Sequence, residues 1–300
     1  MAGVPGSSPG ATTKNPTTRG HFAPSPPRNC AGDLARLTGE MRGLWEYRQF
    51  ILGLVGKDFR QRYLGSMLGG FWMALNPLAI ILIYTIVFGQ LMGHRLPGDG
   101  GGLNYGVFLC AGILPWGLFS ETLQRCASIF VEEGNLLKKV SFPRLALPAV
   151  VLLSSAMSFV VTFAVLMVIL LVTGSFPGWG ILQFLPLLLL QQGLALALGI
   201  TLGILNVFFR DVGHATALLL QYWFWFTPVV YPTSVLPDWA RSILAWNPMT
   251  GVVQGYQGIV LGADAPDSAS LLPIVVAIGF FVLLARLTYR RLTAEMPDFV

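Results

Sequence analysis

The sequence predicts an all-α integral membrane protein with six transmembrane helices. Hydrophobic residues make up 54% of the 300 residues and charged residues only 11%, with a mean hydropathy of +0.66. Because soluble domains usually have about a quarter of their residues charged, this composition indicates a lipid environment. Six apolar runs reach the roughly 20 residues that a spanning helix needs. Nearly all basic residues lie on one side of these runs, as in membrane proteins of fixed orientation.

The predicted spans cover residues 68–92, 105–130, 145–173, 181–209, 214–231 and 268–289. The short linker GSFPGWG joins the third and fourth spans, which predicts a tight helical hairpin. Segment 242–263 is uncharged and long enough to span, but Asn247-Pro248 and several glycines interrupt it. Broken backbone is not tolerated facing lipid. We therefore expect short or re-entrant helices on one side of the membrane before the last span.

The distribution of basic residues favours six spans over seven. With six, 17 of the 19 Lys and Arg residues fall on the side of the N-terminus, and only Arg95 and Arg241 fall on the other. A seventh span would move Arg286, Arg290 and Arg291 to the outside. The positive-inside rule therefore predicts that both termini are cytoplasmic.

The segments outside the spans differ in character. Residues 1–32 are rich in Pro, Gly, Ser and Thr, which predicts a disordered tail and not a signal peptide. Residues 33–65 are predicted to form an amphipathic helix at the cytoplasmic face of the bilayer, or alternatively a helix packed on a soluble partner. Residues 66–290 then form the transmembrane domain and 291–300 a cytoplasmic tail. The apolar positions of the amphipathic helix recur at helical spacing: Leu34, Leu37, Met41, Leu44, Ile51, Val55 and Phe59.

No catalytic or metal site is predicted. Gly53–Asp58 lacks the P-loop pattern, because Ile51 and Asp58 occupy required Gly and Ser/Thr positions, so we expect no ATP bound by this chain. The three cysteines and three histidines show no metal-ligand spacing. Glu121 is one helical turn from Arg125, which predicts an interfacial ion pair and not a proton relay. A membrane glycosyltransferase or acyltransferase, the enzyme alternative, would need acidic or histidine catalysts at a membrane face.

The segment VEEGNLLKKVSFPR, residues 131–144, is a charged interruption between two apolar runs. Its acids come early and its lysines late, which favours a short helix through the helix dipole. Leu136, Leu137 and Val140 offer an apolar edge. The pattern is typical of an element that docks into a partner, although a solvated loop would give the same composition.

Six sequence blocks occur in a fixed order: RYLGSMLGGFWMALNPLAIILIYTIVF, GILPWGLFSETL, NLLKKVSFPRLALP, LNVFFRDVGH, FTPVVYP and WNPMT. Together they resemble the permease subunits of polysaccharide-exporting ABC-2 transporters, over residues 44–291. Asn76-Pro77 in the first span is more similar to the O-antigen and teichoic-acid branch than to the capsule branch. The N-terminal tail has no counterpart in this pattern.

This resemblance implies a homodimer in the bacterial inner membrane, with two copies of a separate ATPase that supplies ATP and Mg²⁺ chemistry. The substrate would be a lipid-linked polysaccharide, most similar to O-antigen, and nucleic acid is not expected as a partner. Other substrates on the same fold remain alternatives: teichoic acid, capsule, glycolipid or a drug. The short helices before the last span would be external gate helices.

The resemblance also assigns roles to individual residues. An ATPase-coupling helix would contain Glu132, Glu133, Asn135, Leu136, Leu137, Lys138, Lys139, Phe142, Pro143 and Arg144. The interfacial helix at the channel entrance would contain Arg60, Arg62 and Tyr63. Aromatic side chains could line the channel or belong to the membrane-interface belt. They are Phe71, Trp72, Trp116, Phe119, Tyr222, Trp223, Trp225 and Tyr231.

Overall fold

The computed structural model describes residues 45, 47–63, 102–134, 136, 142–143, 145–172, 174, 176–262 and 267–292, with single positions between 75 and 86. The predicted tail 1–32 and nearly all of the predicted span 68–92, including Phe71 and Trp72, lie outside the described residues.

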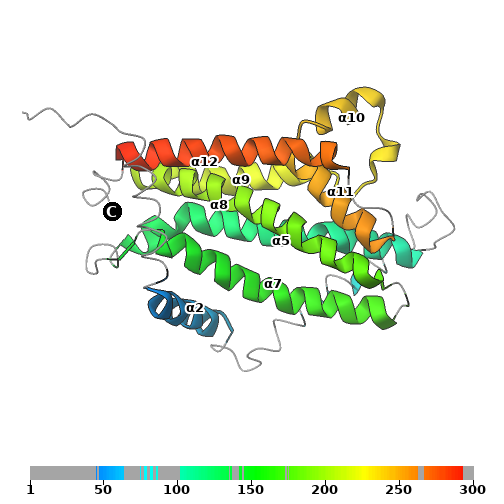
Figure 1. Ribbon diagram of the computed structural model, residues 1–300, viewed down its shortest axis with the longest axis horizontal. Coiled ribbons are helices and arrows are strands. Elements are labelled where there is room, and N and C mark those ends of the chain that lie inside the picture. The colour runs from blue at the N-terminus through cyan, green and yellow to red at the C-terminus, as the bar shows by residue number, and fades with distance from the viewer. Residues whose placement is uncertain are drawn as a thin grey trace, which may run out of the picture. The chain divides into compact units, whose positions relative to one another are not determined.

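The described residues form helices and turns, and no strand occurs among them, which confirms the all-α prediction for this part of the chain. The long helices are α5 (Gly102–Glu132), α7 (Ala146–Val172), α8 (Phe184–Phe208), α9 (Asp211–Trp225) and α12 (Leu272–Leu292). The short 3-10 helices η2 (Gly178–Gln183) and η4 (Ser268–Leu271) precede α8 and α12. In Figure 1 the long helices run side by side along the bundle.

Four stretches are long and apolar enough to cross a membrane: Tyr105–Glu132, Ala146–Val172, Gly178–Phe208 and Ser268–Thr288. They lie over the second, third, fourth and sixth predicted spans. Over the fifth predicted span, α9 has 15 residues and is followed by a turn. The described residues thus contain a multi-pass bundle, whereas the total of six spans stays a prediction.

Helix α5 is at the centre of this bundle and α12 is at its edge. In the most apolar 18-residue stretch of α5, 78% is buried, compared with 6% in the corresponding stretch of α12. The outward side chains of α12 are apolar, including Val276, Phe280 and Leu283. Since water would not favour such a surface, this face of α12 is suited to contact with lipid or with another protein.

Helices α5 and α8 approach each other closely at two glycines of α8. A Cβ at Gly199 would lie 2.6 Å from the Cβ of Cys126, and a Cβ at Gly203 would meet the backbone carbonyl of Cys126. Gly199 and Gly203 are four residues apart, and this spacing of small residues lets helix backbones pack tightly in membranes. Nearby, Asn206 donates to the Ala127 carbonyl and accepts from the Gly213 amide, both at 2.9 Å, so it joins α8 to α5 and to the start of α9.

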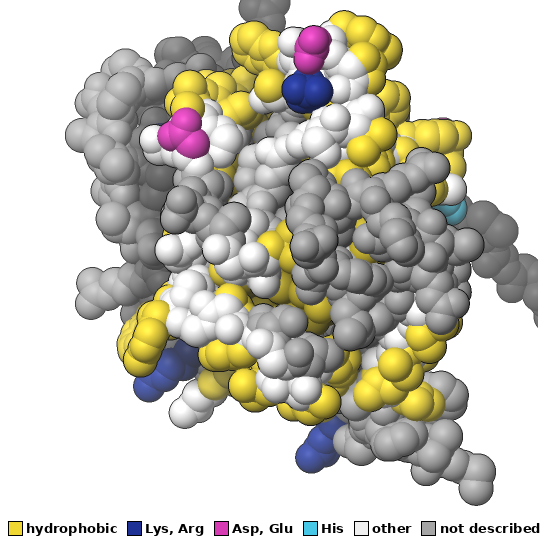
Figure 2. All heavy atoms as spheres, turned by 90° about the vertical axis from the view of Figure 1, so that its right-hand side faces the viewer, with side chains coloured by type: hydrophobic (Ala, Val, Ile, Leu, Met, Phe, Trp, Pro, Cys, Tyr) yellow, Lys and Arg dark blue, Asp and Glu magenta, His cyan; other side chains and the backbone are white. Residues whose placement is uncertain are grey.

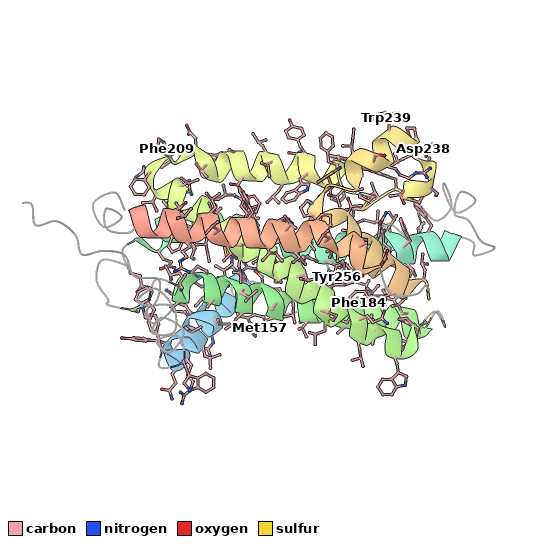
Figure 3. All side chains as sticks on the ribbon, turned by 45° about the horizontal axis from the view of Figure 1, so that its top comes forward. Met157, Phe184, Phe209, Asp238, Trp239 and Tyr256 are labelled. Carbon is pink, nitrogen blue, oxygen red and sulfur yellow. The ribbon has the colours of Figure 1, made fainter. Side chains whose placement is uncertain are left out.

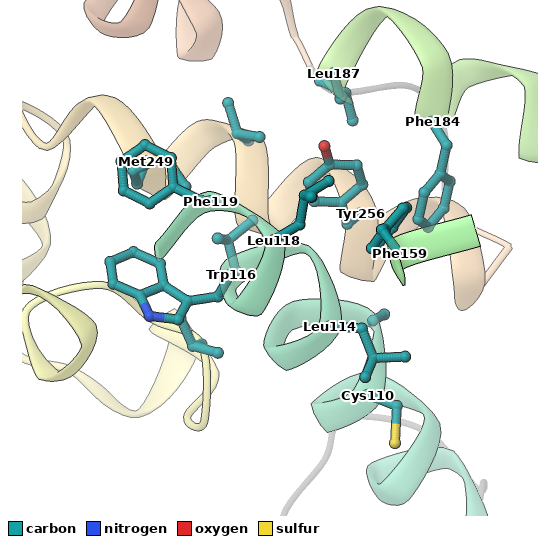
Figure 4. Close-up of a cluster of buried hydrophobic side chains, with 14 of the residues drawn as sticks. Cys110, Leu114, Trp116, Leu118, Phe119, Phe159, Phe184, Leu187, Met249 and Tyr256 are labelled. Atoms are coloured by element: carbon teal, nitrogen blue, oxygen red, sulfur yellow. The ribbon is translucent and has the colours of Figure 1, made fainter. Parts of the chain in front are cut away.

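The main core lies where α5, α8 and the shorter α11 (Pro248–Val260) meet. Figure 4 shows Tyr256 beside Phe184 and Phe159, and the two rings of Tyr256 and Phe184 have centroids 4.8 Å apart. The Tyr256 hydroxyl donates to Gln191 of α8 at 2.8 Å, and the amide of Gln191 donates in turn to the carbonyl of Pro115 in α5. This buried chain satisfies its polar groups internally, as an apolar surrounding requires.

The interrupted segment before α12 forms short helices, as the sequence predicted, and not one long helix. Segment 242–263 contains the end of α10 (Asp238–Leu244) and the whole of α11, and η3 (Thr233–Val235) precedes it; its position on one side of the membrane stays a prediction. Asn247 caps α11 by accepting from the Met249 amide at 3.0 Å, and Pro248 occupies the first turn. In Figure 1, α10 and α11 lie at one end of the bundle, whereas α2 (Arg48–Tyr63) lies toward the other.

If the close α5–α8 approach holds the bundle together, Gly203→Leu will lower the thermal unfolding temperature in detergent. The added side chain would collide with backbone and Phe130, an overpacking cost of about 1–3 kcal/mol. Gly279→Leu in α12 is the matched control, because a Cβ there has no heavy atom within 4 Å. Equal melting temperatures for the two variants would contradict the role given to Gly203.

Candidate functional site

Helix α2 packs against α7 through one apolar face. Ile51 and Val55 are buried against Ala146 and Val150 of α7, together with Phe142 from the segment before α7. Basic residues such as Lys57 and Arg60 lie on exposed positions of the same helix. The described half of the predicted amphipathic helix therefore covers part of its own bundle, with its basic face left outward.

Charged and hydroxyl side chains join α2, α5 and α7 in what we call the charged cluster. Its members are Asp58, Arg62, Glu121, Arg125, Ser154 and Ser155. Arg125 is central, since its guanidinium donates to Asp58 at 2.9 Å and to Ser154 at 2.6 Å and lies 3.8 Å from Glu121.

Arg62 of α2 completes the charged cluster. It donates to Glu121 at 2.6 Å and lies 3.6 Å from Asp58. Ser154 donates to Asp58 at 2.6 Å, and Ser155 donates to Glu121 at 3.2 Å. Each carboxylate therefore contacts both arginines and one serine.

The charged cluster has two acids and two bases and so carries no net formal charge. Its charged side chains are only 20–32% exposed. Charge at such depth is costly unless it is paired and hydrogen-bonded, and here every charged group has partners. The cluster can therefore hold α2 onto α5 and α7 through polar contacts that add to the apolar face of α2.

The structure confirms the predicted Glu121–Arg125 ion pair and adds four members that the sequence analysis did not pair with it, the charged Asp58 and Arg62 and the hydroxyls of Ser154 and Ser155. Asp58 and Arg62 are also four residues apart and form their own contact along α2. That repeated i,i+4 spacing of opposite charges was the available signal. The contacts between the charged pair of α2 and the charged pair of α5 could be identified only from the fold.

The predicted coupling segment begins at the end of α5, where Glu132 is exposed. Leu136 is partly buried and packs against the core formed by α5, α7 and α8. Phe142 packs against both that core and α2, with its ring centroid 5.4 Å from that of Phe50. The apolar residues Leu136 and Phe142 thus contact their own bundle.

The remaining residues of this segment are placed as follows. Glu133 follows α5 in a turn, its amide bonded to the Ile129 carbonyl at 2.9 Å, and the Pro143 carbonyl accepts from the Ala146 amide at 2.8 Å. Asn135, Leu137, Lys138, Lys139 and Arg144 lie outside the described residues, as does the side chain of Tyr63 in the predicted entrance set. Of that set, Arg60 is exposed and Arg62 belongs to the charged cluster.

The predicted channel aromatics fall into two groups. Trp116 and Phe119 are buried and make edge-on contacts with Trp223 at centroid distances of 6.1 and 5.4 Å. Tyr222 and Trp225 of α9 are 63% and 61% exposed. The first group is used for packing within the bundle and offers no face to a substrate, whereas Trp223 and Tyr231 are partly buried.

An apolar groove of about 660 Å³ separates α9 from α10 and the start of α11. Tyr222, Phe226 and Ile243 line it, and all three are largely exposed. Within the described part of the chain, no group of three His, Cys, Asp or Glu residues is placed to hold a metal ion.

Comparison with known proteins identifies similar chains. The ABC-2 type transporter family model matches residues 49–261. An O-antigen export system permease protein from Myxococcus xanthus is 36% identical over 78% of this chain and 88% of its own length. One from Klebsiella pneumoniae is 29% identical over 69% of this chain and 78% of its own. A polysialic acid transport protein from Escherichia coli is 26% identical over 76% and 88% of the two chains.

A double-mutant cycle between Asp58→Ala and Arg125→Ala tests the charged cluster. We expect a coupling free energy of about 1–2 kcal/mol, below that of a fully buried pair because both side chains are partly exposed. The free energies of unfolding are measured by denaturant titration in detergent. The exposed pair Asp238–Arg241, 3.5 Å apart on α10, is the control and should show almost no coupling. Additive effects of Asp58→Ala and Arg125→Ala would show that the cluster does not hold α2.

Proposed function

Because this chain belongs to the ABC-2 type transporter family, we propose that it is the membrane-spanning permease subunit of an ATP-driven exporter of lipid-linked polysaccharide resembling O-antigen. The observation that carries the substrate assignment is the 36% identity, over most of both chains, to a permease named for O-antigen export. The apolar, multi-helix bundle supports the transport role. Polysialic acid is the second candidate substrate, because two relatives at 26% identity are named for its transport.

The energy for transport comes from a separate ATPase subunit. The sequence contains no P-loop, and in the described part of the bundle Asp58, Arg62, Glu121 and Arg125 pair with one another in the charged cluster. Two copies of this chain, with two ATPases on the cytoplasmic side of the inner membrane, would enclose a passage. The exposed apolar groove beside α9 supports such an assembly, because large exposed apolar surfaces indicate contact with lipid or protein.

The segment between α5 and α7 transmits ATPase movement to the helices. Its described apolar residues Leu136 and Phe142 contact α5, α7, α8 and α2, so a displacement of the segment acts directly on those helices. The exposed Glu132, together with Lys138 and Lys139 farther along the sequence, supplies charge for the ATPase surface. Charged residues at an interface mainly fix register and partner choice.

The two ends of the bundle have different roles in this proposal. Helix α2, with its basic outer face, lies beside the cytoplasmic entrance, where it attracts anionic lipid headgroups. The short helices α10 and α11 at the opposite end act as the external gate. Tyr222 and Trp225 are the ring-bearing side chains available to the passage from the described part of α9.

Reversing the charge of the exposed Glu132 should weaken the complex with the ATPase. We expect Glu132→Lys to insert normally but to lower recovery of the co-purified ATPase about tenfold, equivalent to about 1.4 kcal/mol. Affinity purification in mild detergent followed by mass spectrometry measures this. Asp267→Lys, at the opposite end of the bundle, should have no effect. Full recovery with Glu132→Lys would remove that residue from the interface.

Reconstitution tests whether transport requires the ATPase subunit in addition to this chain. The purified chain alone in proteoliposomes should move no lipid-linked O-antigen across the bilayer, whereas chain and ATPase together should do so when ATP is supplied. The readout is the access of an externally added glycosidase to the polymer. Translocation by the chain alone would overturn the proposed function.

A further inference from the structure

A second pocket, distinct from the apolar groove, lies beside the N-terminal half of α5. It has a volume of about 400 Å³ and is bounded by α5, the turn after α9, η3 and α11. The residues that matter below are Phe108, Tyr231, Thr233, Ser234, Gln254 and Gln257. Phe108 and Arg125 are 17 positions apart on α5, so the pocket is about 25 Å from the charged cluster along the helix axis.

The pocket is at the α10–α11 end of the bundle. Figure 3 places Trp239 and Asp238 of α10 at the end opposite to Phe209, which follows α8. Figure 2 views this end and shows hydrophobic side chains with only scattered acidic and basic ones among the residues that are coloured. Among the described residues, none that lines the pocket is charged.

Gln257 supplies a fixed hydrogen-bond acceptor. Its side chain is only 4% exposed, and its amide nitrogen donates to the carbonyls of Val229 at 3.0 Å and Pro228 at 3.4 Å. The side-chain oxygen makes no hydrogen bond within the described part of the chain. Gly112 leaves room for this arrangement, since a Cβ there would lie 2.8 Å from the Gln257 nitrogen. The packing therefore orients an amide whose acceptor is available to a ligand hydroxyl.

The rim of the pocket adds groups that both donate and accept. Gln254 donates to the Thr233 hydroxyl oxygen at 3.1 Å, which leaves the Thr233 proton and the Gln254 carbonyl for a ligand. Ser234 is exposed beside them. Uncharged groups that donate and accept hydrogen bonds are complementary to sugar hydroxyls, because each hydroxyl can also donate one hydrogen bond and accept others.

Aromatic rings form the apolar part of the lining. The Tyr231 hydroxyl donates to the Trp225 carbonyl at 2.9 Å, so Tyr231 offers the pocket its ring and not its hydroxyl. Phe108 is only 6% exposed and stacks on Tyr105 with centroids 5.8 Å apart, so it closes the pocket as an apolar wall and Tyr231 supplies the accessible ring. Flat aromatic surface beside oriented amides suits a pyranose, which has apolar C–H faces and a hydroxyl edge.

We propose that this pocket binds a single neutral pyranose unit of the exported polysaccharide as the polymer leaves the permease. The inference rests on the polysaccharide-export function and adds a location and a charge preference to it. Recognition of an acidic sugar would need an arginine or lysine to pair with the carboxylate, and the described residues of the lining offer neither. The pocket thus selects for neutral units.

Saturation-transfer NMR on the full chain, purified in a detergent without a sugar headgroup, tests the proposal. The probes are the neutral methyl pyranosides of glucose, mannose and galactose, with N-acetylneuraminic acid as the acidic probe, all at millimolar concentration. We expect transfer to at least one neutral probe and none to the acidic one. Absence of transfer to all three neutral probes, or equal transfer to the acidic one, would overturn the proposal.

Substitutions at the rim of the pocket test whether the sugar detected by NMR is bound there. Thr233→Val combined with Gln254→Leu removes two polar contacts without disturbing Gln257 and should weaken binding of the neutral probe about tenfold. Tyr231→Leu should weaken it similarly. Trp246→Leu and Ser242→Ala, both at exposed positions outside the pocket, are the matched controls. Unchanged binding in the rim variants would place the sugar elsewhere.

An export assay separates this inference from the function on which it rests. If the chain with its ATPase exports polysaccharide but the rim variants bind sugar like the wild type, the pocket assignment alone fails. If the complex exports no polysaccharide, the proposed function fails, whatever the NMR result.

Discussion

A charge within an apolar bundle is stable only if it is paired, and the charged cluster meets that constraint with groups from three helices. Arg125 and Arg62 neutralise Asp58 and Glu121, and Ser154 and Ser155 complete the hydrogen bonding. This arrangement fixes α2 on the bundle and positions Phe50 to meet Phe142. The segment after α5 is consequently attached to the same group of helices that carries the cluster, which brings the cytoplasmic part of the proposed mechanism into one region.

The length of the apolar runs was sufficient to predict the four long helices over the second, third, fourth and sixth spans, because hydrocarbon solvent leaves the backbone few alternatives. The first and fifth predicted spans stay predictions. The break at Asn247-Pro248 likewise predicted short helices, since Asn caps and Pro begins α11. The partners of Glu121 could be predicted only within α5. Arg62 is 59 positions away in the chain, and no local pattern indicates that contact. Leu136 and Trp116 show the same limit, because an apolar residue in sequence does not reveal whether it packs inward or faces a partner.

The two ends of α5 differ in chemistry. One end carries ion pairs and lies beside the basic helix α2, whereas the other borders a neutral pocket of amides, hydroxyls and rings. This asymmetry agrees with transport in one direction. In the proposed function, the basic side would attract the anionic surface of the membrane, and the neutral pocket at the opposite side would accept an uncharged sugar unit.

The glycine contacts between α5 and α8 limit how the bundle can rearrange. Backbones in direct contact at Gly199 and Gly203 cannot slide past each other without collision, and Asn206 adds a hydrogen bond to the same pair. The two helices should therefore shift as one rigid body during a transport cycle. Asn206 and Gln124 both bond to Gly213, so the start of α9 moves with this pair. Movement relative to α7 then falls at the turn before η2, around Gly174, Phe176 and Pro177.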